Sequence, residues 1–358
     1  MAARITITPI APAARPTVLR SIERCPAMPR SLTRTLHPCF PSALRRPPCR
    51  GVTGGLGRPI KPHAYPWPVT VQPVTRTFGG QSMTAPLREA LLKAPGAAFG
   101  RAFEERTHGF LHPVDLDVAR REHAAFSELL ASLGTTVCLL DTEVESPDLL
   151  YAFDPLLITD RGAIPLRPGK PSRHVEPAAI EAWTLAQSIP TIGRIEAPGT
   201  IEAGDTFWLR PDLFCIGRTL RTNDEGARQL AELVGGDVRV FDVPYWHGPE
   251  ELVHLLSVVH PIADDLATVF LPLLPVGLWQ LLREMGYRLI EVDEDEYLRL
   301  GCNVLVVRPG VVIVAAGNRK VTAALASHGF EVHTYPATEI GINGSGGPTC
   351  MTRPILRG

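Results

Sequence analysis

Four short segments of the sequence hold the side chains that could do chemistry. They are residues 146–155, 196–205, 254–260 and 344–352. The last contains Cys350 behind a Gly-rich stretch, and glycines allow the positive φ angles and close backbone approach that a tight active-site loop needs. A cysteine there is either a nucleophile or a small, buried apolar side chain. Spacing alone does not separate these two interpretations.

The other three segments supply acids and a histidine. Asp154 interrupts an apolar run, where a carboxylate is costly to bury unless it is paired or bound to a cation. Glu202 precedes an apolar strand, which places it at the mouth of that strand, although its segment could also form a solvated turn. His254 is flanked by Leu and Val residues, so a histidine satisfied inside the core is the alternative to a functional one.

A repeated pattern of elements is predicted to position these segments. Five helices each end at a glycine or proline, and a short β-rich strand follows each one. The helices are predicted at 116–133, 177–188, 224–234, 276–285 and 318–328, and the strands that follow at 137–141, 191–197, 238–244, 287–293 and 330–336. Strand pairs are predicted between helices, for example 207–210 with 213–217. Asp115 is the expected N-cap of the first helix.

The residues that end these helices recur every 43 to 56 positions, a period typical of repeat arrays and propellers. Each unit reads as ββαβ. We therefore predict an α/β fold, a five-bladed α/β propeller built of ββαβ repeats around a central axis. An open α/β sheet is the alternative, because periodicity does not fix closure.

Charge and proline divide the chain into two parts. The whole sequence has 36 basic and 37 acidic residues, but residues 1–82 hold 12 basic residues and one acid, a net charge of +11. Residues 83–358 hold the other 24 basic and 36 acidic residues, a net charge of −12. Fourteen of the 35 prolines fall in the first part and interrupt every candidate helix. We predict a disordered, basic Pro/Arg-rich leader over 1–82 and a globular domain over 83–358.

Three explanations of the leader remain open. It is an Arg-rich transit peptide, a basic arm that binds nucleic acid, or a segment that is not made because translation starts at Met83. Arg outnumbers Lys 32 to 4 over the chain, which fits a GC-rich genome, where start sites are easily placed too early.

Composition excludes several classes of protein. A hydrophobic content of 45% with a mean hydropathy of +0.06 is typical of a globular chain. No run of 18 apolar residues occurs, so neither a membrane-spanning helix nor a membrane partner is expected. Seven cysteines without a CxxC pair exclude a disulfide scaffold and a zinc knuckle.

Partners and cofactors are limited by the same data. The acidic domain lacks interleaved basic and aromatic residues, which argues against nucleic acid. No Gly-rich phosphate loop follows a strand, so no nucleotide cofactor is expected. The 11 histidines do not cluster at ligand spacing, so no metal is expected. A cytoplasmic location is expected, with organellar targeting left open by the leader.

Together the four segments resemble the guanidine-modifying (pentein) superfamily, and within it the bacterial dimethylarginine dimethylaminohydrolases. The resemblance covers nearly all of residues 83–358 and none of 1–82. It is carried by residues 147–155, 163–173, 194–205, 216–228, 254–255 and 348–351. The family has a five-bladed fold around a central active site, in agreement with the repeat count, and residues 83–358 would be its catalytic domain.

The resemblance implies a cofactor-free hydrolase of a substituted arginine, expected to be Nω-methylated, that releases citrulline and an amine. Cys350 would attack the guanidinium carbon and form a covalent thiouronium-type intermediate. His254 would protonate the leaving amine and then deprotonate water. Glu202 would complete this catalytic set, and Asp154 would join it in binding the planar cation, because guanidinium NH groups bind carboxylates two at a time.

Further roles follow from the same resemblance. Arg167 and Arg221 match positions that hold the α-carboxylate of an amino-acid substrate, and Asp148 matches a substrate contact. The expected partner is a small cationic guanidino compound, and a homodimer is possible. Since the acids oppose a thiolate and a bound cation favours it, Cys350 is expected to be a thiol in the free enzyme and to ionise on binding.

Two departures from the family bear on the substrate. Phe153 stands where the family often has an acid, and Leu256 stands where arginine deiminases carry an aspartate. An apolar wall at Leu256 would suit methyl groups. Arginine deiminase and amidinotransferase remain the alternatives. A non-enzymatic scaffold is disfavoured, because it would not need Asp154, Glu202, His254 and Cys350 together.

Overall fold

Five small β-sheets contain the strands of the described part of the chain, residues 76–244, 246–248 and 253–358, in the computed structural model. The strands are β1 Leu87–Leu92, β2 Thr136–Leu139, β3 Leu156–Thr159, β4 Gly162–Pro165, β5 Thr206–Arg210, β6 Leu213–Arg218, β7 Asp237–Asp242, β8 Val259–Ala263, β9 Leu266–Val269, β10 Arg288–Glu291, β11 Leu305–Arg308, β12 Val311–Ala315, β13 Glu331–Tyr335 and β14 Arg353–Arg357. The sheet orders are β14-β1-β2, β3-β4, β5-β6-β7, β8-β9-β10 and β11-β12-β13. The predicted five-bladed fold is confirmed.

Three of the sheets share one pattern of pairing. In each, the first two strands form an antiparallel pair, and the third strand joins the second in parallel after a helix. The sheet β14-β1-β2 repeats this pattern with strands from both ends of the described chain, because β14 pairs antiparallel with β1 and β2 pairs parallel with it. The last strand thereby completes the first blade and closes the ring.

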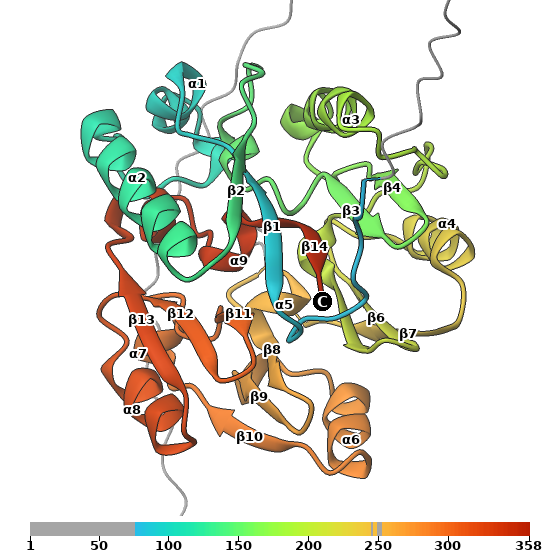
Figure 1. Cartoon of the computed structure of the whole chain (residues 1–358), viewed down its shortest axis with the longest axis vertical. Coiled ribbons are helices and arrows are strands. Elements are labelled where there is room, and N and C mark those ends of the chain that lie inside the picture. Colours follow the sequence, from blue (N-terminus) through green and yellow to red (C-terminus); the bar gives the residue numbers. More distant parts are fainter. Residues whose placement is uncertain (1–75, 245, 249–252) are drawn as a thin grey trace, which may run out of the picture. The chain divides into compact units, whose positions relative to one another are not determined.

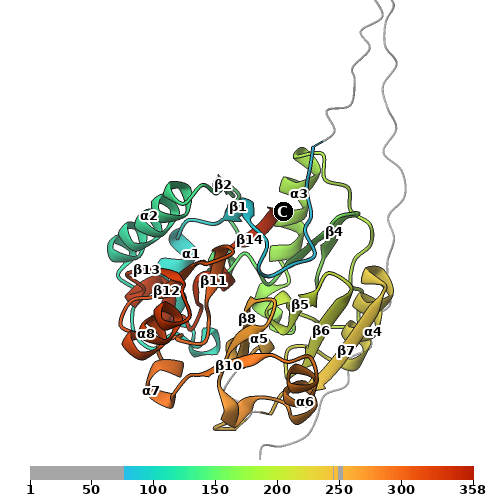
Figure 2. The same ribbon diagram turned by 60° about the horizontal axis from the view of Figure 1, so that its bottom comes forward.

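The longer helices, one in each blade, lie on the outside. They are α2 Leu116–Ser132, α3 Glu176–Ala186, α4 Asp224–Val234, α6 Val276–Glu284 and α8 Arg319–Ser327. All but α3 connect the second strand of a sheet to its third. Figures 1 and 2 both place these five helices at the periphery, with β8, β11 and β14 closer to the middle. Four shorter helices are α1 Ala97–Gly100, α5 Leu255–Val258, α7 Glu294–Tyr297 and α9 Pro348–Met351. In the described residues, no helix has both the length and the apolar character needed to span a membrane.

Burial follows the order of strands within a blade. Every residue of β3 is buried, as are four of the five residues of β8, whereas β7 has no buried residue. The helices present one face to this core, as α2 does with Ala119, Phe126 and Leu130. The predicted cap of α2 is confirmed, since the Asp115 carboxylate accepts hydrogen bonds from the backbone of Asp117 and Val118 at 3.1 and 3.0 Å.

One predicted strand is wrong. Residues 191–197 form no strand, and only Thr191 makes a single parallel bridge, to Ala163. The segment lies between Pro190 and Pro198, with Gly193 inside it, and these residues are poor partners in a ladder of strands. The sheet β3-β4 is therefore two-stranded.

Part of the predicted leader belongs to the folded domain. Residues 1–75 lie outside the described residues, but 76–82 are described. The backbone of Gly79 donates to Ile355 O at 2.8 Å and accepts from Arg357 N at 2.8 Å. This stretch therefore pairs with β14, and the folded domain reaches back beyond the boundary predicted at Met83.

Candidate active site

One polar side chain from each blade lies just ahead of the first strand of its sheet. Asp154 precedes β3, Glu202 precedes β5, His254 precedes β8, Asn303 precedes β11 and Cys350 precedes β14, each by two to five residues. The five blades thus contribute equivalent positions to one end of the propeller. Asn303 was not predicted, although its place in the fifth repeat is a signal that could have identified it.

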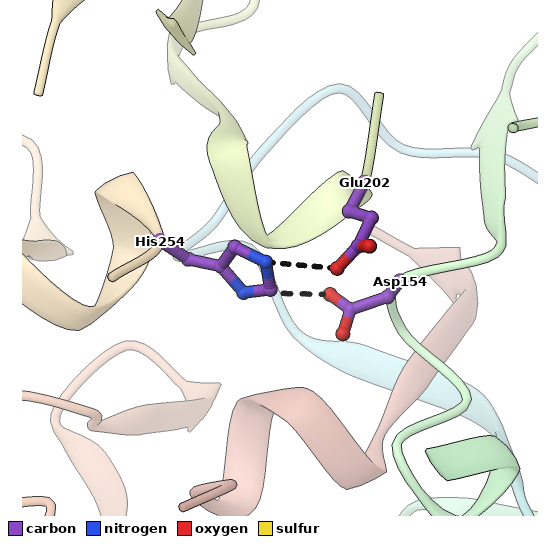
Figure 3. A group of neighbouring side chains, drawn as sticks. All are labelled: Asp154, Glu202 and His254. Atoms are coloured by element: carbon purple, nitrogen blue, oxygen red, sulfur yellow. Dashed lines mark hydrogen bonds and ion pairs between the residues drawn. The ribbon is translucent and has the colours of Figure 1, made fainter. Parts of the chain in front are cut away.

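Asp154, Glu202 and His254 come together as predicted, and Figure 3 shows their side chains converging from three segments. The Nε2 atom of His254 lies 2.9 Å from Glu202 Oε2, and its Nδ1 atom lies 4.0 Å from Asp154 Oδ1. Gly204 allows this approach, because a Cβ at that position would lie 2.4 Å from His254 Nδ1. The backbone N–H of Gly204 also donates to Asp154 Oδ1 at 2.9 Å.

Two arginines bind the same carboxylates. Arg173, which is 2% exposed, places Nη1 2.7 Å from Asp154 Oδ2 and 3.4 Å from Glu202 Oε2, and it also pairs with Glu176 at 2.9 Å. Arg221 Nη1 lies 2.8 Å from Glu202 Oε2. Glu202 is fully buried by these partners and does not line the cavity described below. Its geometry is that of a positioning residue for His254, where the sequence predicted a catalytic one.

The charges around His254 determine its protonation. Burial opposes a charged ring, but the carboxylates of Asp154 and Asp205 and the hydrogen bond with Glu202 outweigh it and raise the pKa of His254 to about 9. Burial likewise opposes the Glu202 charge, yet Arg221, Arg173 and His254 hold the pKa of Glu202 well below its usual range. Near neutral pH the pair is therefore an imidazolium and a carboxylate, which equips His254 to donate a proton.

Cys350 lies in α9 with its thiol facing the amide of Asn303. Asn303 Nδ2 donates to Cys350 Sγ at 3.3 Å, and Asn303 Oδ1 accepts from the backbone of Thr349 at 3.0 Å. Burial and the nearby Asp154 charge raise the pKa of the Cys350 thiol to about 12. The free protein therefore holds a thiol whose hydrogen-bond donor is already in place.

The Gly-rich loop before Cys350 is held from both sides. The buried Glu122 carboxylate accepts hydrogen bonds from the backbone N–H groups of Glu339 and Ile340 at 2.8 and 3.1 Å, in the turn just before this loop. A Cβ at Gly346 would lie 2.1 Å from the Tyr151 ring, so only glycine fits against that ring. The predicted need for close backbone approach in this loop is met.

A cavity of about 530 Å³ joins these groups. Five of the seven predicted site residues line it: Asp148, Asp154, Arg221, His254 and Cys350. Its remaining walls include cationic, polar and apolar side chains, among them Lys170, Arg173, Asn303, Ser257 and Leu300. The volume is that of a small-molecule site.

Lys170 takes the place in the cavity that the sequence assigned to Arg167. The Lys170 ammonium lies 2.6 Å from Asp148 Oδ2, and both side chains are buried. Burial lowers the pKa of Lys170, while Asp148 opposes that change. Arg167 does not line the cavity in the described part of the chain, and its Nη1 donates to Gly199 O at 3.2 Å. No pattern in the sequence distinguishes these two positions, because both cations occupy one short loop.

Phe153 and Leu256 do not shape this cavity, contrary to the sequence argument. The Phe153 ring points away from this cavity, on the other side of the segment that leads into β3. There the Arg353 guanidinium lies 3.8 Å from the ring centroid. Leu256 is buried in the core. The apolar wall expected at Leu256 is therefore absent, and the residue at position 153 does not face the outer end of a ligand in the cavity.

Asp154, Glu202 and His254 could also be considered as metal ligands, since one ligand atom from each lies within 4.8 Å of the others. A cation there would have to displace Arg173 and Arg221 from the two carboxylates. It would also require a neutral His254, whose raised pKa favours the imidazolium. This donor set fits ion pairs and proton transfer better than it fits a metal ion.

Comparisons with known proteins identify relatives of the whole domain. A sequence profile of arginine deiminase matches residues 272–357. Dimethylarginine dimethylaminohydrolase of Pseudomonas aeruginosa is 33% identical over 227 residues, which cover 54% of this chain and 89% of that protein. The enzyme of the same name from Streptomyces coelicolor is 26% identical over 247 residues, which cover 69% and 89%.

A solved structure agrees with these relatives. The Pseudomonas aeruginosa enzyme, as a cysteine-to-serine variant complexed with citrulline, matches this structure with a TM-score of 0.65 at 26% identity. The match covers 76% of this chain and 100% of the other.

Proposed function

This chain belongs to the dimethylarginine dimethylaminohydrolase family of the guanidine-modifying superfamily, and from that premise we propose that it hydrolyses an Nω-methylated arginine to citrulline and an amine. A hydrolase that acts on the guanidino group of arginine derivatives is what the family relationship establishes. The methylated substrate, the citrulline product and the roles of individual residues are the proposal.

One observation carries it. A protonated histidine, a half-buried cysteine thiol and a carboxylate share one cavity, and each comes from a different blade. These are the groups that a covalent substitution at a guanidinium carbon requires: a nucleophile, a proton donor for the leaving amine and an acceptor for the cation.

The reaction proceeds in two halves. Cys350 releases its proton to solvent when the substrate cation binds, and Sγ forms a bond to the guanidinium carbon. The C–N bond to the substituted amine breaks as His254 donates its proton to that nitrogen. Neutral His254 then takes a proton from water as the oxygen attacks the thiouronium carbon, and the C–S bond breaks to leave citrulline and restore the cysteine.

Asp154 is proposed to bind the guanidinium. Of the site acids, Glu202 is enclosed by Arg173, Arg221 and His254, so its charge is already compensated. Asp154 lines the cavity and keeps Oδ1 directed at Gly204 and His254, with only Oδ2 bound to Arg173. It is therefore the carboxylate with capacity for a new donor.

The carboxylate end of the substrate is proposed to bind Arg221 and Lys170. Both side chains line the cavity. Burial is the largest effect that lowers the pKa of Lys170, the Asp148 carboxylate opposes it, and the positive charge of Arg221 lowers this pKa further. Two neighbouring cations that face one cavity favour an anionic group between them. Arg167, which the sequence assigned to this role, lies outside the cavity, so we propose Lys170 in its place.

Unmethylated arginine is the second candidate substrate. The arginine deiminase match over residues 272–357 favours it, and the apolar wall that would have selected methyl groups is not formed by Leu256. Both candidates use the same cysteine and histidine, so the chemistry of the leaving amine decides between them.

A citrulline assay on the purified protein tests the proposal. Arginine, monomethylarginine, dimethylarginine and guanidino compounds without an α-carboxylate are compared, with release of methylated amine measured in parallel. Citrulline with dimethylamine from dimethylarginine, lost in Cys350→Ser, is the expected result. Citrulline from arginine alone would move the assignment to the second candidate, and activity that survives Cys350→Ser would refute the mechanism.

A further inference from the structure

A second cavity lies on the side of the propeller opposite the nucleophile. It is lined by residues from the first strands of all five sheets, including Leu157 of β3, Phe207 of β5, His260 of β8, Leu305 of β11 and Arg353 of β14. Phe153 lines this cavity as well, while its neighbour Asp154 lines the active site. The two cavities therefore lie on opposite sides of the strand entrance that carries these two residues.

Two buried arginines bring positive charge to this second cavity. Arg353, Arg357 and His260 line it and are 3%, 6% and 1% exposed, and Thr349 is 2% exposed. No acid lines it in the described residues, and neither arginine forms an ion pair with a described carboxylate. Among the residues that the structure describes, the Arg353 side chain donates only to Phe153 O, at 3.0 Å, and the Arg357 side chain donates to Ala85 O and Val306 O, at 2.6 and 3.0 Å.

Two buried donors that line this cavity have no partner among the described residues. They are Arg353 Nε and Thr349 Oγ1. His260 Nδ1 also has none there, but burial lowers the pKa of His260 to about 3, so its ring is neutral and adds no charge. An unpaired buried donor costs about 1–3 kcal/mol, and more when the group is charged. Burial lowers the pKa of Arg353 to about 9 and that of Arg357 to about 10, which shows how poorly their charges are compensated. Asp154, the carboxylate that opposes this effect at Arg353, is already bound to Arg173 at 2.7 Å.

We propose that this cavity binds a small inorganic anion, with chloride as the ligand that fits. Its volume is about 30 Å³. A monatomic anion fits that space. Chloride accepts hydrogen bonds from guanidinium and hydroxyl groups alike, which matches donors that lack acceptors.

The anion would sit directly behind the nucleophile. Thr349 precedes Cys350 in α9, and the Phe153 backbone that accepts from Arg353 donates to Cys350 O at 3.0 Å. An anion on Arg353 and Thr349 would therefore fix the turn that carries the cysteine from its rear side. This site is independent of the proposed substrate chemistry, because none of the seven predicted site residues lines it.

Bromide, which scatters anomalously and replaces chloride, is the direct probe. Crystals of the full chain grown with sodium bromide should show an anomalous peak within hydrogen-bond distance of Arg353 Nε or Thr349 Oγ1. Diffraction that shows only water there at high bromide concentration would overturn the proposal.

Thermal unfolding gives the solution test. Replacing sodium gluconate by sodium chloride at equal ionic strength should raise the melting temperature by about 2–4 °C. Arg353→Met or, if that variant does not fold, Thr349→Val should lose this gain. Two controls should keep it: His254→Gln, which removes a cation from the active site, and Arg288→Met, which removes an exposed arginine paired with Asp265. A gain that survives in Thr349→Val, or that disappears in His254→Gln, would refute the proposed location.

Discussion

Replacing Glu202 by glutamine is expected to lower the pKa of His254 without changing the shape of the site. The amide oxygen in the place of Oε2 still accepts from His254 Nε2, which lies 2.9 Å from Glu202 Oε2, whereas the amide NH2 in the place of Oε1 loses the hydrogen bond from Gly169 N, which lies 3.1 Å from Glu202 Oε1. The substitution removes one negative charge, while Asp154 and Asp205 keep theirs. The pKa of His254 should therefore fall from about 9 to a value above the ordinary 6.5.

The effect on proton donation follows from that change. At pH 7.5 an imidazole of pKa 9 is almost fully protonated, whereas one of pKa 6.5 is about one-tenth protonated. The supply of the general acid at that pH therefore falls by at most about tenfold, and the high-pH limb of the kcat profile moves down by about one to two pH units.

The raised pKa of His254 also affects the pH dependence of the unfolding free energy, which can be measured without substrate. The folded pKa of His254 lies above its unfolded value, so its stabilisation is complete below pH 6.5 and is lost as the pH rises through 9. The difference corresponds to about 3 kcal/mol of unfolding free energy lost over this window. In Glu202→Gln this loss should be clearly smaller, and in His254→Gln it should be absent.

Urea unfolding followed by circular dichroism between pH 6 and 9.5 measures this window. Glu232→Gln is the matched control, since Glu232 is an exposed acid that pairs with Arg228. The control should keep the wild-type pH dependence of both stability and kcat. If Glu202→Gln also keeps both, Glu202 does not hold the proton on His254 and the reasoning fails.

The remaining predictions concern the other groups of the site. Lys170→Met should raise KM for arginine-type substrates several-fold and leave guanidino compounds without a carboxylate unchanged in steady-state assays; equal effects on both would refute its role. Thiolate absorbance at 240 nm should show Cys350 as a thiol up to at least pH 9 in the free protein, with ionisation at lower pH once a guanidinium ligand binds. Asn303→Ala should lower kcat about 10- to 100-fold with little change in KM, because a hydrogen bond to the developing thiolate is lost; a change in KM alone would contradict this. Arg173→Met removes the arginine that pairs with Glu176 and takes one cation from Asp154 and Glu202, and it should cost about 3–5 kcal/mol in urea unfolding; a loss below about 1 kcal/mol would contradict this account of the network.

The architecture was predictable because the residues that end its helices act locally. A glycine or proline that ends a helix acts within a few residues, and Gly134, Gly235, Gly286 and Gly329 follow the helices α2, α4, α6 and α8 within one or two positions. The strand predicted at 191–197 failed because pairing depends on a partner elsewhere in the chain, which a local apolar pattern does not reveal.

Site residues were predictable only where their position in the repeat determined where the side chain lies. Asp154, Glu202, His254 and Cys350 stand at the entrances to the first strands, so the closure of the ring brings them together. The directions in which loop side chains point were not predictable. Neighbouring residues in extended chain point to opposite faces, which is why Phe153 and Asp154 line different cavities.

Arg173 was overlooked for a different reason. The Asp154 and Glu202 carboxylates and the backbone carbonyls of Asp148 and Tyr151 come from segments up to 29 positions away, and only the folded chain shows that they converge on one guanidinium. The acids assigned from sequence to a cationic substrate are therefore largely paired within the protein. A count of acidic residues overstated the negative charge that is available to a ligand.

This internal pairing explains how one cation can prepare both reacting groups. In the free protein, burial and then the Asp154 charge raise the pKa of Cys350, while the same carboxylate is the largest of the effects that overcome burial and raise the pKa of His254. Negative charge disfavours the thiolate and favours the imidazolium. A guanidinium that binds Asp154 offsets that charge, so both pKa values fall together. The thiol becomes easier to ionise, and the imidazolium becomes a stronger proton donor to the leaving amine. No separate base is then needed to activate Cys350, because the substrate's own charge performs that role.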